Sequence, residues 1–275
     1  MTHRYLDVAR DDHVVTCTFS NPPRHTLTAG GVLELFQVLN EIESDASVRA
    51  VVFTGAGEGV FIAHYDVGEL SQTAERNVEA GVPAGSSEGS KHELHGMHQL
   101  CLRLERMSAI TIAAMNGSTA GGGFELGLAC DFRLLADGPY RVGLPETSVG
   151  IIPGAGGTQR YARLLGTALA LDLILHAKLL TPAEAFELGL VHRIYPTDRF
   201  RDEVEAFAAD IASRAPIALA AAKHAIQQGS RMPLDESLLL EQRCFERTMR
   251  SKDAAGAMRA YIGRTGTIPY QWKGE

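Results

Sequence analysis

The chain has 275 residues, of which 45% are hydrophobic and 21% charged, and its net charge is −7 at pH 7. Such a composition is typical of a soluble globular protein with one large domain, or with one domain and a small appendage. The negative charge and the lack of a Lys/Arg run argue against a nucleic-acid partner. The four cysteines are widely spaced, so we expect reduced thiols rather than disulfides.

We also expect no membrane partner and a cytoplasmic location. No apolar stretch approaches the roughly 18 residues that are needed to span a bilayer. The first seven residues carry charge but no apolar run follows them, so they do not resemble a signal peptide.

The first half of the chain alternates between strand and helix patterns. The helix predicted at 29–42 has Thr28 as its N-cap and an apolar stripe at 3.6-residue spacing. A second helix ends near residue 129. The other predicted elements are strands at about 5–8, 14–19, 50–54, 109–115 and 132–136, and a helix at about 94–106.

Residues 72–90 are rich in Gly, Ser, Ala and Glu and show little hydrophobic periodicity, so we predict a mobile loop or lid. From about Gln159 the pattern is helical, apart from a short strand at 191–195. Strand–helix alternation followed by helices predicts an α/β core at 1–198 and an α-helical C-terminal region at 199–275. The helices predicted in that region are 199–212, 216–228, 235–250 and 253–262.

Several motifs do not support the functions that they first suggest. None of the three glycine clusters has the Gly-x-Gly-x-x-Gly spacing of a dinucleotide site. The string Gly85-Ser86-Ser87-Glu88-Gly89 lies in the polar loop, whereas a nucleophile elbow needs a strand before it and a helix after it. His92, His95 and His98 drift around a helix surface without an acidic or cysteine partner. We therefore expect solvated histidines and no metal site.

Three consecutive glycines, Gly121 to Gly123, follow the strand predicted at 109–115 and precede a helix. Residues without side chains let a ligand approach the backbone, and the first amides of a helix lack intrahelical partners. Such amides can hold a thioester oxygen as it becomes an enolate, and one donor contributes about 3 kcal/mol. Tight packing of a helix on a strand would explain the same glycines equally well.

Glu125 and Glu146 both lie among apolar or small residues beside glycine- or proline-marked turns. If both point into one cavity, desolvation and mutual repulsion raise the pKa of at least one of them. Two such carboxylates can act as general acid and base. The alternative for each is an ordinary surface carboxylate.

The run at 112–126 resembles the crotonase (enoyl-CoA hydratase/isomerase) superfamily, and the similarity extends through Pro145-Glu146, 152–160 and 181–191 to the helical tail. This resemblance implies an α/β fold, a crotonase-like spiral of ββα units with a C-terminal α-helical region. It also implies an acyl-CoA substrate, no other cofactor, and a homotrimer or a hexamer made of two trimers.

The resemblance further implies hydration of a trans-2-enoyl-CoA. Backbone N–H groups of Tyr65 and Gly122 would form the oxyanion hole. Glu125 and Glu146 would hold the water together, with Glu125 helping to deprotonate it and Glu146 delivering a proton to Cα. The residues implied in binding CoA or substrate are Arg24, Ala63, His64, Asp66, Gly121, Tyr261 and Lys273, the last two from a neighbouring subunit.

The chain departs from the family pattern at two places. His64 and Tyr65 stand where small residues are usual, and Gly68 stands where a CoA-contacting lysine is common. The first departure leaves other crotonase-fold chemistries open, namely those of an enoyl-CoA isomerase, a C–C bond hydrolase or a lyase. A non-catalytic acyl-CoA binding protein is the remaining alternative.

Overall fold

The computed structural model describes residues 3–83, 93–263 and 270–275. In these residues the chain forms a six-stranded sheet in the order β1-β2-β3-β5-β7-β10 and a four-stranded sheet in the order β4-β6-β8-β9. The larger sheet consists of β1 (Leu6–Asp11), β2 (Val14–Phe19), β3 (Ala50–Gly55), β5 (Ile110–Met115), β7 (Phe132–Ala136) and β10 (Arg193–Tyr195). The smaller sheet consists of β4 (Gly59–Val60), β6 (Gly117–Ala120), β8 (Val142–Gly143) and β9 (Leu179–Leu180).

The two sheets grow together along the chain. β3 is followed by β4, β5 by β6, and β7 by β8, so each turn of the chain adds one strand to each sheet. The added strands pair in parallel within their sheets, whereas β1 and β9 pair antiparallel at the edges. This arrangement is the spiral of strand–strand–helix units that the resemblance to the crotonase superfamily implied.

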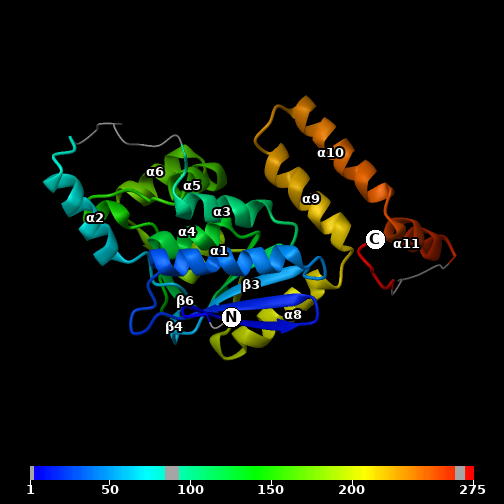
Figure 1. The fold of residues 1–275 in the computed structure, drawn as a ribbon, viewed down its shortest axis with the longest axis horizontal. Helices are drawn as coiled ribbons and strands as arrows, with labels where there is room; N and C mark the ends of the chain where they lie inside the picture. The colour runs from blue at the N-terminus through cyan, green and yellow to red at the C-terminus, as the bar shows by residue number, and fades with distance from the viewer. Residues whose placement is uncertain (1–2, 84–92, 264–269) are drawn as a thin grey trace.

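Two hydrophobic cores lie on the two faces of the larger sheet. Alternate residues of a strand point to opposite faces, and in β3 Val51 and Phe53 join one core while Ala50 and Val52 join the other. The first core is covered by α1 (Ala29–Ser44), α3 (Gly96–Arg106) and α4 (Gly121–Ala129), and the second by α8 (Phe200–Ala212). Figure 1 shows these helices on their respective sides of the sheet.

The predicted helices agree with the observed ones to within a few residues. Thr28 caps α1, as predicted, and its Oγ1 accepts a hydrogen bond from the Gly31 N–H at 3.2 Å. The remaining helices are α5 (Gly157–Leu165), α6 (Thr167–Leu175), α7 (Pro182–Glu187), α9 (Pro216–Gly229), α10 (Leu234–Met249), α11 (Lys252–Ile262) and the short 3₁₀ turns η1 (Glu146–Val149) and η2 (Thr197–Arg199).

The prediction of a loop at 72–90 is wrong over its first part, because α2 spans Val67–Glu79. No residue of α2 is buried, although Val67, Leu70 and Val78 recur at helical spacing, so its apolar side chains cover no core in the single chain. Asp66 caps it by accepting a hydrogen bond from the Glu69 N–H at 3.1 Å. Residues 84–92, which include the Gly-x-Ser-x-Gly string, lie outside the described residues.

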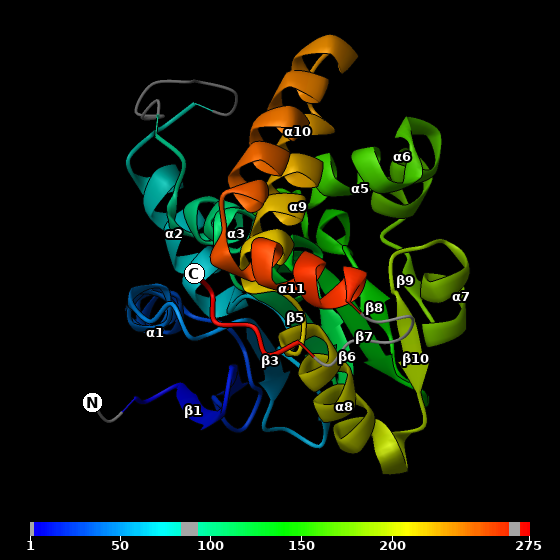
Figure 2. The same ribbon diagram turned by 90° about the vertical axis from the view of Figure 1, so that its right-hand side faces the viewer.

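After α8 come three C-terminal helices, of which α9 packs against α3 and β5. α9 and α10 pack on each other as a hairpin, and α11 follows at the end of the molecule opposite α2 (Figures 1 and 2). α8 itself packs on the sheet, although the sequence groups it with the C-terminal region. No helix in the described part of the chain has the length and hydrophobicity to cross a membrane.

The contact between α4 and the chain at residue 62 gives a stability prediction. A Cβ added at Gly123 would lie 2.2 Å from the Ile62 carbonyl oxygen, whereas one added at Gly127 would meet nothing nearer than 3.5 Å. We expect Gly123→Ala to lower Tm by about 3–10 °C, the effect of roughly 1–3 kcal/mol of overpacking. Gly127→Ala is the matched control in the same helix and should be neutral or slightly stabilising. Equal melting temperatures in thermal unfolding would contradict this packing.

Candidate active site

The glycine turn at the start of α4 packs directly on the segment at 62–65. The Thr119 hydroxyl donates a hydrogen bond to the Ile62 carbonyl at 2.6 Å, and the Ala120 N–H donates one to the Ala63 carbonyl at 2.8 Å. A Cβ added at Gly122 would lie 3.0 Å from the Tyr65 Cβ and 3.4 Å from the Tyr65 nitrogen. The structure therefore brings together the two backbone positions that the sequence proposed for an oxyanion hole.

Both backbone amides are available to a ligand. Gly122 is the second residue of α4, where an N–H has no partner within the helix. Within the described residues, neither the Gly122 nor the Tyr65 N–H donates a hydrogen bond. The start of a helix also carries partial positive charge, which favours an oxygen that gains negative charge.

The Tyr65 side chain is held away from this backbone contact. Its hydroxyl donates to Glu69 Oε2 at 2.9 Å, and the same oxygen accepts from the Ala29 N–H at 2.9 Å. Burial, followed by the hydrogen bond to Glu69, raises the pKa of Tyr65 to about 12. The Nδ1 of His64 lies 2.7 Å from the Tyr65 carbonyl oxygen. The bulky side chains of His64 and Tyr65 therefore leave the Tyr65 backbone N–H free to act as a donor to a ligand.

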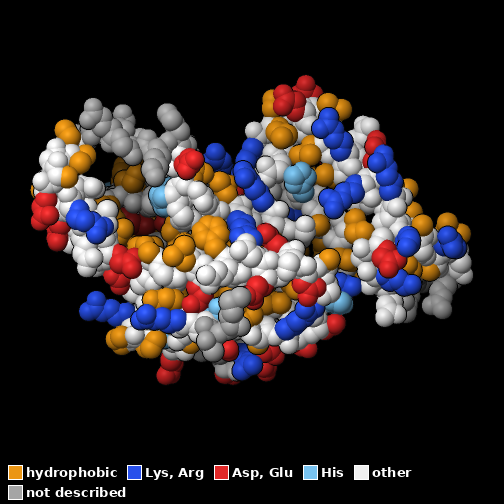
Figure 3. Space-filling view, in the orientation of Figure 1, with side chains coloured by type: hydrophobic (Ala, Val, Ile, Leu, Met, Phe, Trp, Pro, Cys, Tyr) orange, Lys and Arg blue, Asp and Glu red, His pale blue; other side chains and the backbone are white. Residues whose placement is uncertain are grey.

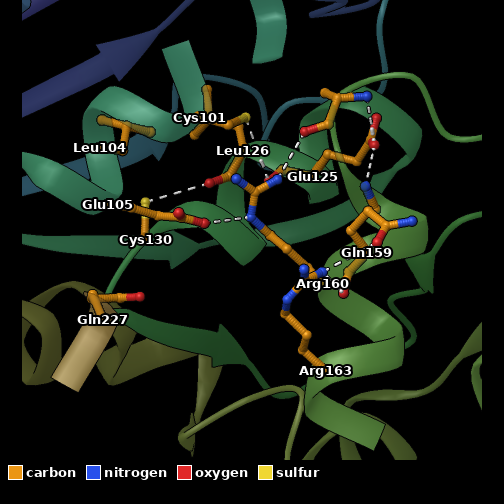
Figure 4. A network of polar contacts seen from close by, with 12 residues as sticks. Cys101, Leu104, Glu105, Glu125, Leu126, Cys130, Gln159, Arg160, Arg163 and Gln227 are labelled. Atoms are coloured by element: carbon orange, nitrogen blue, oxygen red, sulfur yellow. Dashed lines mark hydrogen bonds and ion pairs between the residues drawn. The ribbon is translucent and has the colours of Figure 1, made fainter. Parts of the chain in front are cut away.

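Glu125 is buried in α4 and held by a second backbone turn. Its Oε1 accepts hydrogen bonds from the Ala155 and Gly157 N–H groups, both at 2.7 Å. Figure 4 shows the Glu125 carboxylate meeting this turn. Burial raises the pKa of Glu125, and the two amides and the nearby Arg160 oppose that rise. Both of these hydrogen bonds go to Oε1, and this leaves Oε2 as the oxygen for a substrate or water.

Glu146 begins η1 and is 9% exposed. Its Oε1 would lie 3.1 Å from a Cβ at Gly121, and its Oε2 is buried with no hydrogen-bond partner within the described chain. Burial raises the pKa of Glu146 to about 7, and the charge of Glu125 acts in the same direction. This carboxyl group can therefore give or take a proton near neutral pH.

The two acids face one site. Gly121, which contacts Glu146, and Glu125 are four residues apart in α4 and so lie on the same face of that helix. In agreement with this placement, the charge of Glu125 adds to the effect of burial in raising the pKa of Glu146. Figure 3 shows the surface hollowed between α2 and α3, with hydrophobic and acidic side chains in the hollow.

Sequence reasoning missed Tyr161 and misplaced His98. Tyr161 is 1% exposed and its hydroxyl is unpartnered among the described residues, while its ring packs edge-on against Phe124 at 6.3 Å. Burial and the Glu146 charge raise its pKa. His98 was expected in solvent, but its Nδ1 is buried. The same face of α3 carries Cys101, and the Cys101 Sγ lies 3.9 Å from the Glu125 carbonyl oxygen. His95 is exposed, as expected. His92 lies outside the described residues.

Buried hydroxyl and imidazole atoms give no signal in a sequence, because the helices that enclose them are distant in the chain. His98 in particular falls within a polar stretch beside the predicted loop. In the described residues no cluster of His, Cys, Asp and Glu could hold a metal ion.

The remaining predicted binding residues are spread along the chain. Arg24 is exposed between β2 and α1, and Asp66 caps α2 and accepts a hydrogen bond from the Thr26 hydroxyl at 3.0 Å. Tyr261 in α11 is 67% exposed, and the Lys273 N–H donates to Asp253 near the C-terminus. The structure does not bring Tyr261 and Lys273 to the site of their own chain, because α11 lies at the opposite end from α2 (Figure 1).

Comparison with known families agrees with this geometry. The family model described as Enoyl-CoA hydratase/isomerase matches residues 9–274. The chain belongs to this family. The resemblance to the crotonase superfamily and the predicted fold are thereby confirmed.

Individual members of the enoyl-CoA hydratase/isomerase family match over nearly the whole chain. A short-chain-enoyl-CoA hydratase from Clostridium acetobutylicum is 34% identical over 254 residues, which cover 92% of each protein. The human protein named enoyl-CoA hydratase domain-containing protein 2, mitochondrial, is 34% identical and covers 92% of this chain and 85% of its own. The crystal structure of an enoyl-CoA hydratase from Bacillus anthracis superposes with a TM-score of 0.86 at 34% identity and covers 99% of this chain and 100% of its own.

The raised pKa of Glu146 gives a pH-dependent stability prediction. A buried acid whose folded-state pKa is about 7 favours folding below its unfolded pKa of about 4.5, and this contribution is lost as the pH rises to about 7. We therefore expect Glu146→Gln to raise Tm at pH 8 by about 2–4 °C, as roughly 1 kcal/mol would do, and to leave Tm nearly unchanged at pH 4. Thermal unfolding at both pH values tests this, and a lower Tm for the variant at pH 8 would contradict it.

Proposed function

We propose that the protein adds water across the double bond of a trans-2-enoyl-CoA and produces a 3-hydroxyacyl-CoA. The observation that carries this proposal is the convergence of two buried acids, Glu125 and Glu146, beside the unpartnered amides of Tyr65 and Gly122. The family of the chain and the names of its relatives support the same class of reaction.

In the proposed reaction the thioester carbonyl accepts hydrogen bonds from the Tyr65 and Gly122 N–H groups. These donors stabilise the enolate oxygen and so make Cβ open to attack. Glu125, held by two amide hydrogen bonds, acts as the base and takes a proton from water, and the water oxygen bonds to Cβ. Glu146, protonated because burial raises its pKa, gives a proton to Cα. Proton return from Glu125 to Glu146 completes the cycle.

Acyl-CoA is the proposed substrate, and we propose no other cofactor. The segment containing Ala63, His64 and Asp66 adjoins the proposed oxyanion hole, so CoA would lie along this segment. Gly121 lies beside Glu146. Arg24 is exposed before α1 and would contact a phosphate.

We further propose a homotrimer or hexamer, in which Tyr261 and Lys273 act on a neighbour's ligand. α10 has no buried residue in the single chain, and its apolar side chains stand exposed. Covering such side chains in an assembly would remove them from water. The exposed apolar residues of the C-terminal helices are Ile226, Leu234, Leu238, Leu239, Phe245, Met249, Met258, Tyr261 and Ile262.

Isomerisation of a 3-enoyl-CoA is the second candidate function. Glu146 alone can take a proton from one carbon and return it to another, because its pKa is about 7. The departure at His64 and Tyr65 leaves this chemistry possible. A non-catalytic binding protein is less consistent with a buried acid that has no partner in the described residues, because such a group is costly to fold around.

Substitution of the two acids tests the proposal. We expect the protein to hydrate crotonyl-CoA. The reaction is measured as the loss of enoyl-thioester absorbance. Glu125→Gln and Glu146→Gln should each lower kcat by at least ~100-fold, the scale of a general acid or base. Glu187→Gln is the control, because Glu187 is exposed in α7.

Other outcomes of the same assay would contradict hydration. If the parent isomerises a 3-enoyl-CoA but does not hydrate, and only Glu146→Gln abolishes isomerisation, the protein is an isomerase. Tight acyl-CoA binding without turnover of any substrate indicates a binding protein.

A further inference from the structure

Arg160 lies behind the turn that holds Glu125. Its side chain is 13% exposed, its Nε donates to Glu105 Oε1 at 2.8 Å, and its Nη1 donates to the Ala155 carbonyl oxygen at 2.8 Å. Figure 4 shows the guanidinium between Glu105 of α3 and the backbone that also meets Glu125. One planar group thus joins a buried carboxylate to the active-site turn.

Ala155 connects the arginine to the acid. Its carbonyl oxygen accepts from Arg160, and its N–H donates to Glu125 Oε1 at 2.7 Å. The next residue, Gly156, has φ of 100°, and a Cβ there would lie 2.4 Å from Arg160 Nη1. The turn is therefore shaped around the guanidinium, and the position of its amides depends on that group.

Glu105 is the anchor of this arrangement. Its side chain is 6% exposed, and its second oxygen accepts from Arg231 Nη2 at 2.8 Å. Arg231 lies between α9 and α10 and is 35% exposed. Glu105 therefore connects its own helix, α3, to Arg160 of α5. Through Arg231 it also connects α3 to the hairpin of α9 and α10. A buried ion pair of this kind adds little net stability.

We propose that Arg160, anchored by Glu105, is a positioning residue for Glu125: it fixes the Ala155–Gly157 turn so that Oε1 is fully occupied and Oε2 faces the water. This inference rests on the proposed function, because it assigns Glu125 the task of activating water. The positive charge of Arg160 also favours the ionised form of Glu125, which is the form that acts as a base.

The geometry requires an arginine. The two donors point to different acceptors from a rigid plane, whereas a lysine offers one nitrogen on a flexible stem. A lysine at 160 keeps the positive charge but cannot hold Glu105 and Ala155 in the same way. Arg163, one turn later in α5, is exposed and among the described residues hydrogen-bonds to Gln159 alone, so the same substitution there is a matched control (Figure 4).

The experiment compares Arg160→Lys with Arg163→Lys. We expect Arg160→Lys to lower kcat for crotonyl-CoA hydration by about 10–100-fold, since displacement of a reacting group by 1 Å can cost about 100-fold. KM should change less than about threefold, because Arg160 does not contact substrate. The acidic limb of the kcat profile should move to higher pH. Arg163→Lys should match the parent.

A second measurement does not depend on turnover. Carboxyl ¹³C NMR titration, with the Glu125 signal assigned by its loss in Glu125→Gln, should give a higher Glu125 pKa in Arg160→Lys than in the parent. If Arg160→Lys fails to fold, Glu105→Gln, which retains an acceptor oxygen for Arg160, should show the same fall in kcat and the same direction of titration shift.

Two results separate failure of this inference from failure of the proposed function. A parent enzyme that hydrates, with unchanged kcat, pH profile and Glu125 titration in Arg160→Lys, overturns the positioning role alone. A parent that does not hydrate overturns the proposed function, and the titration then decides the positioning role: an unchanged Glu125 pKa overturns it.

Discussion

The close approach of two main-chain segments determines the geometry of this site. α4 begins with three glycines, and at Gly123 there is no room for a Cβ against the Ile62 carbonyl oxygen. This contact places the Gly122 amide beside Tyr65, at the start of a helix where amides lack partners. The spiral of paired sheets makes the contact possible, because β6 leads straight into α4 after pairing beside β4.

The electrostatics of the site follow from the same packing. α4 is buried along its whole length, so it carries Glu125 into surroundings that disfavour a charge. Two amides of the 155–157 turn offset that effect at Glu125, whereas Glu146 has an unpartnered buried oxygen and a pKa of about 7. Two similar side chains thereby have different hydrogen-bond surroundings, which is one way in which a paired base and acid are distinguished.

Hydrophobic spacing and turn residues in the sequence predicted the strands, the glycine turn and most of the helices. The apolar run of β7 and the glycines before Glu125 identified a buried strand and a close backbone approach. α2 was missed because the polar composition of 72–79 outweighed the helical spacing of Val67, Leu70 and Val78, none of which is buried. The pairing of Glu105 with Arg160 joins residues 55 positions apart, and the packing of Tyr161 on Phe124 likewise joins residues that are distant in the chain. Such contacts arise from tertiary packing, so no regular spacing of residues in the sequence indicates them.

The most direct measurement is a crystal structure with butanoyl-CoA, a saturated thioester that cannot be hydrated. The account predicts its carbonyl oxygen within about 3 Å of both the Tyr65 and Gly122 nitrogens, with the acyl carbons between Glu125 and Glu146. A thioester oxygen bound away from these two amides would contradict the account, as would acyl carbons that neither carboxylate can reach.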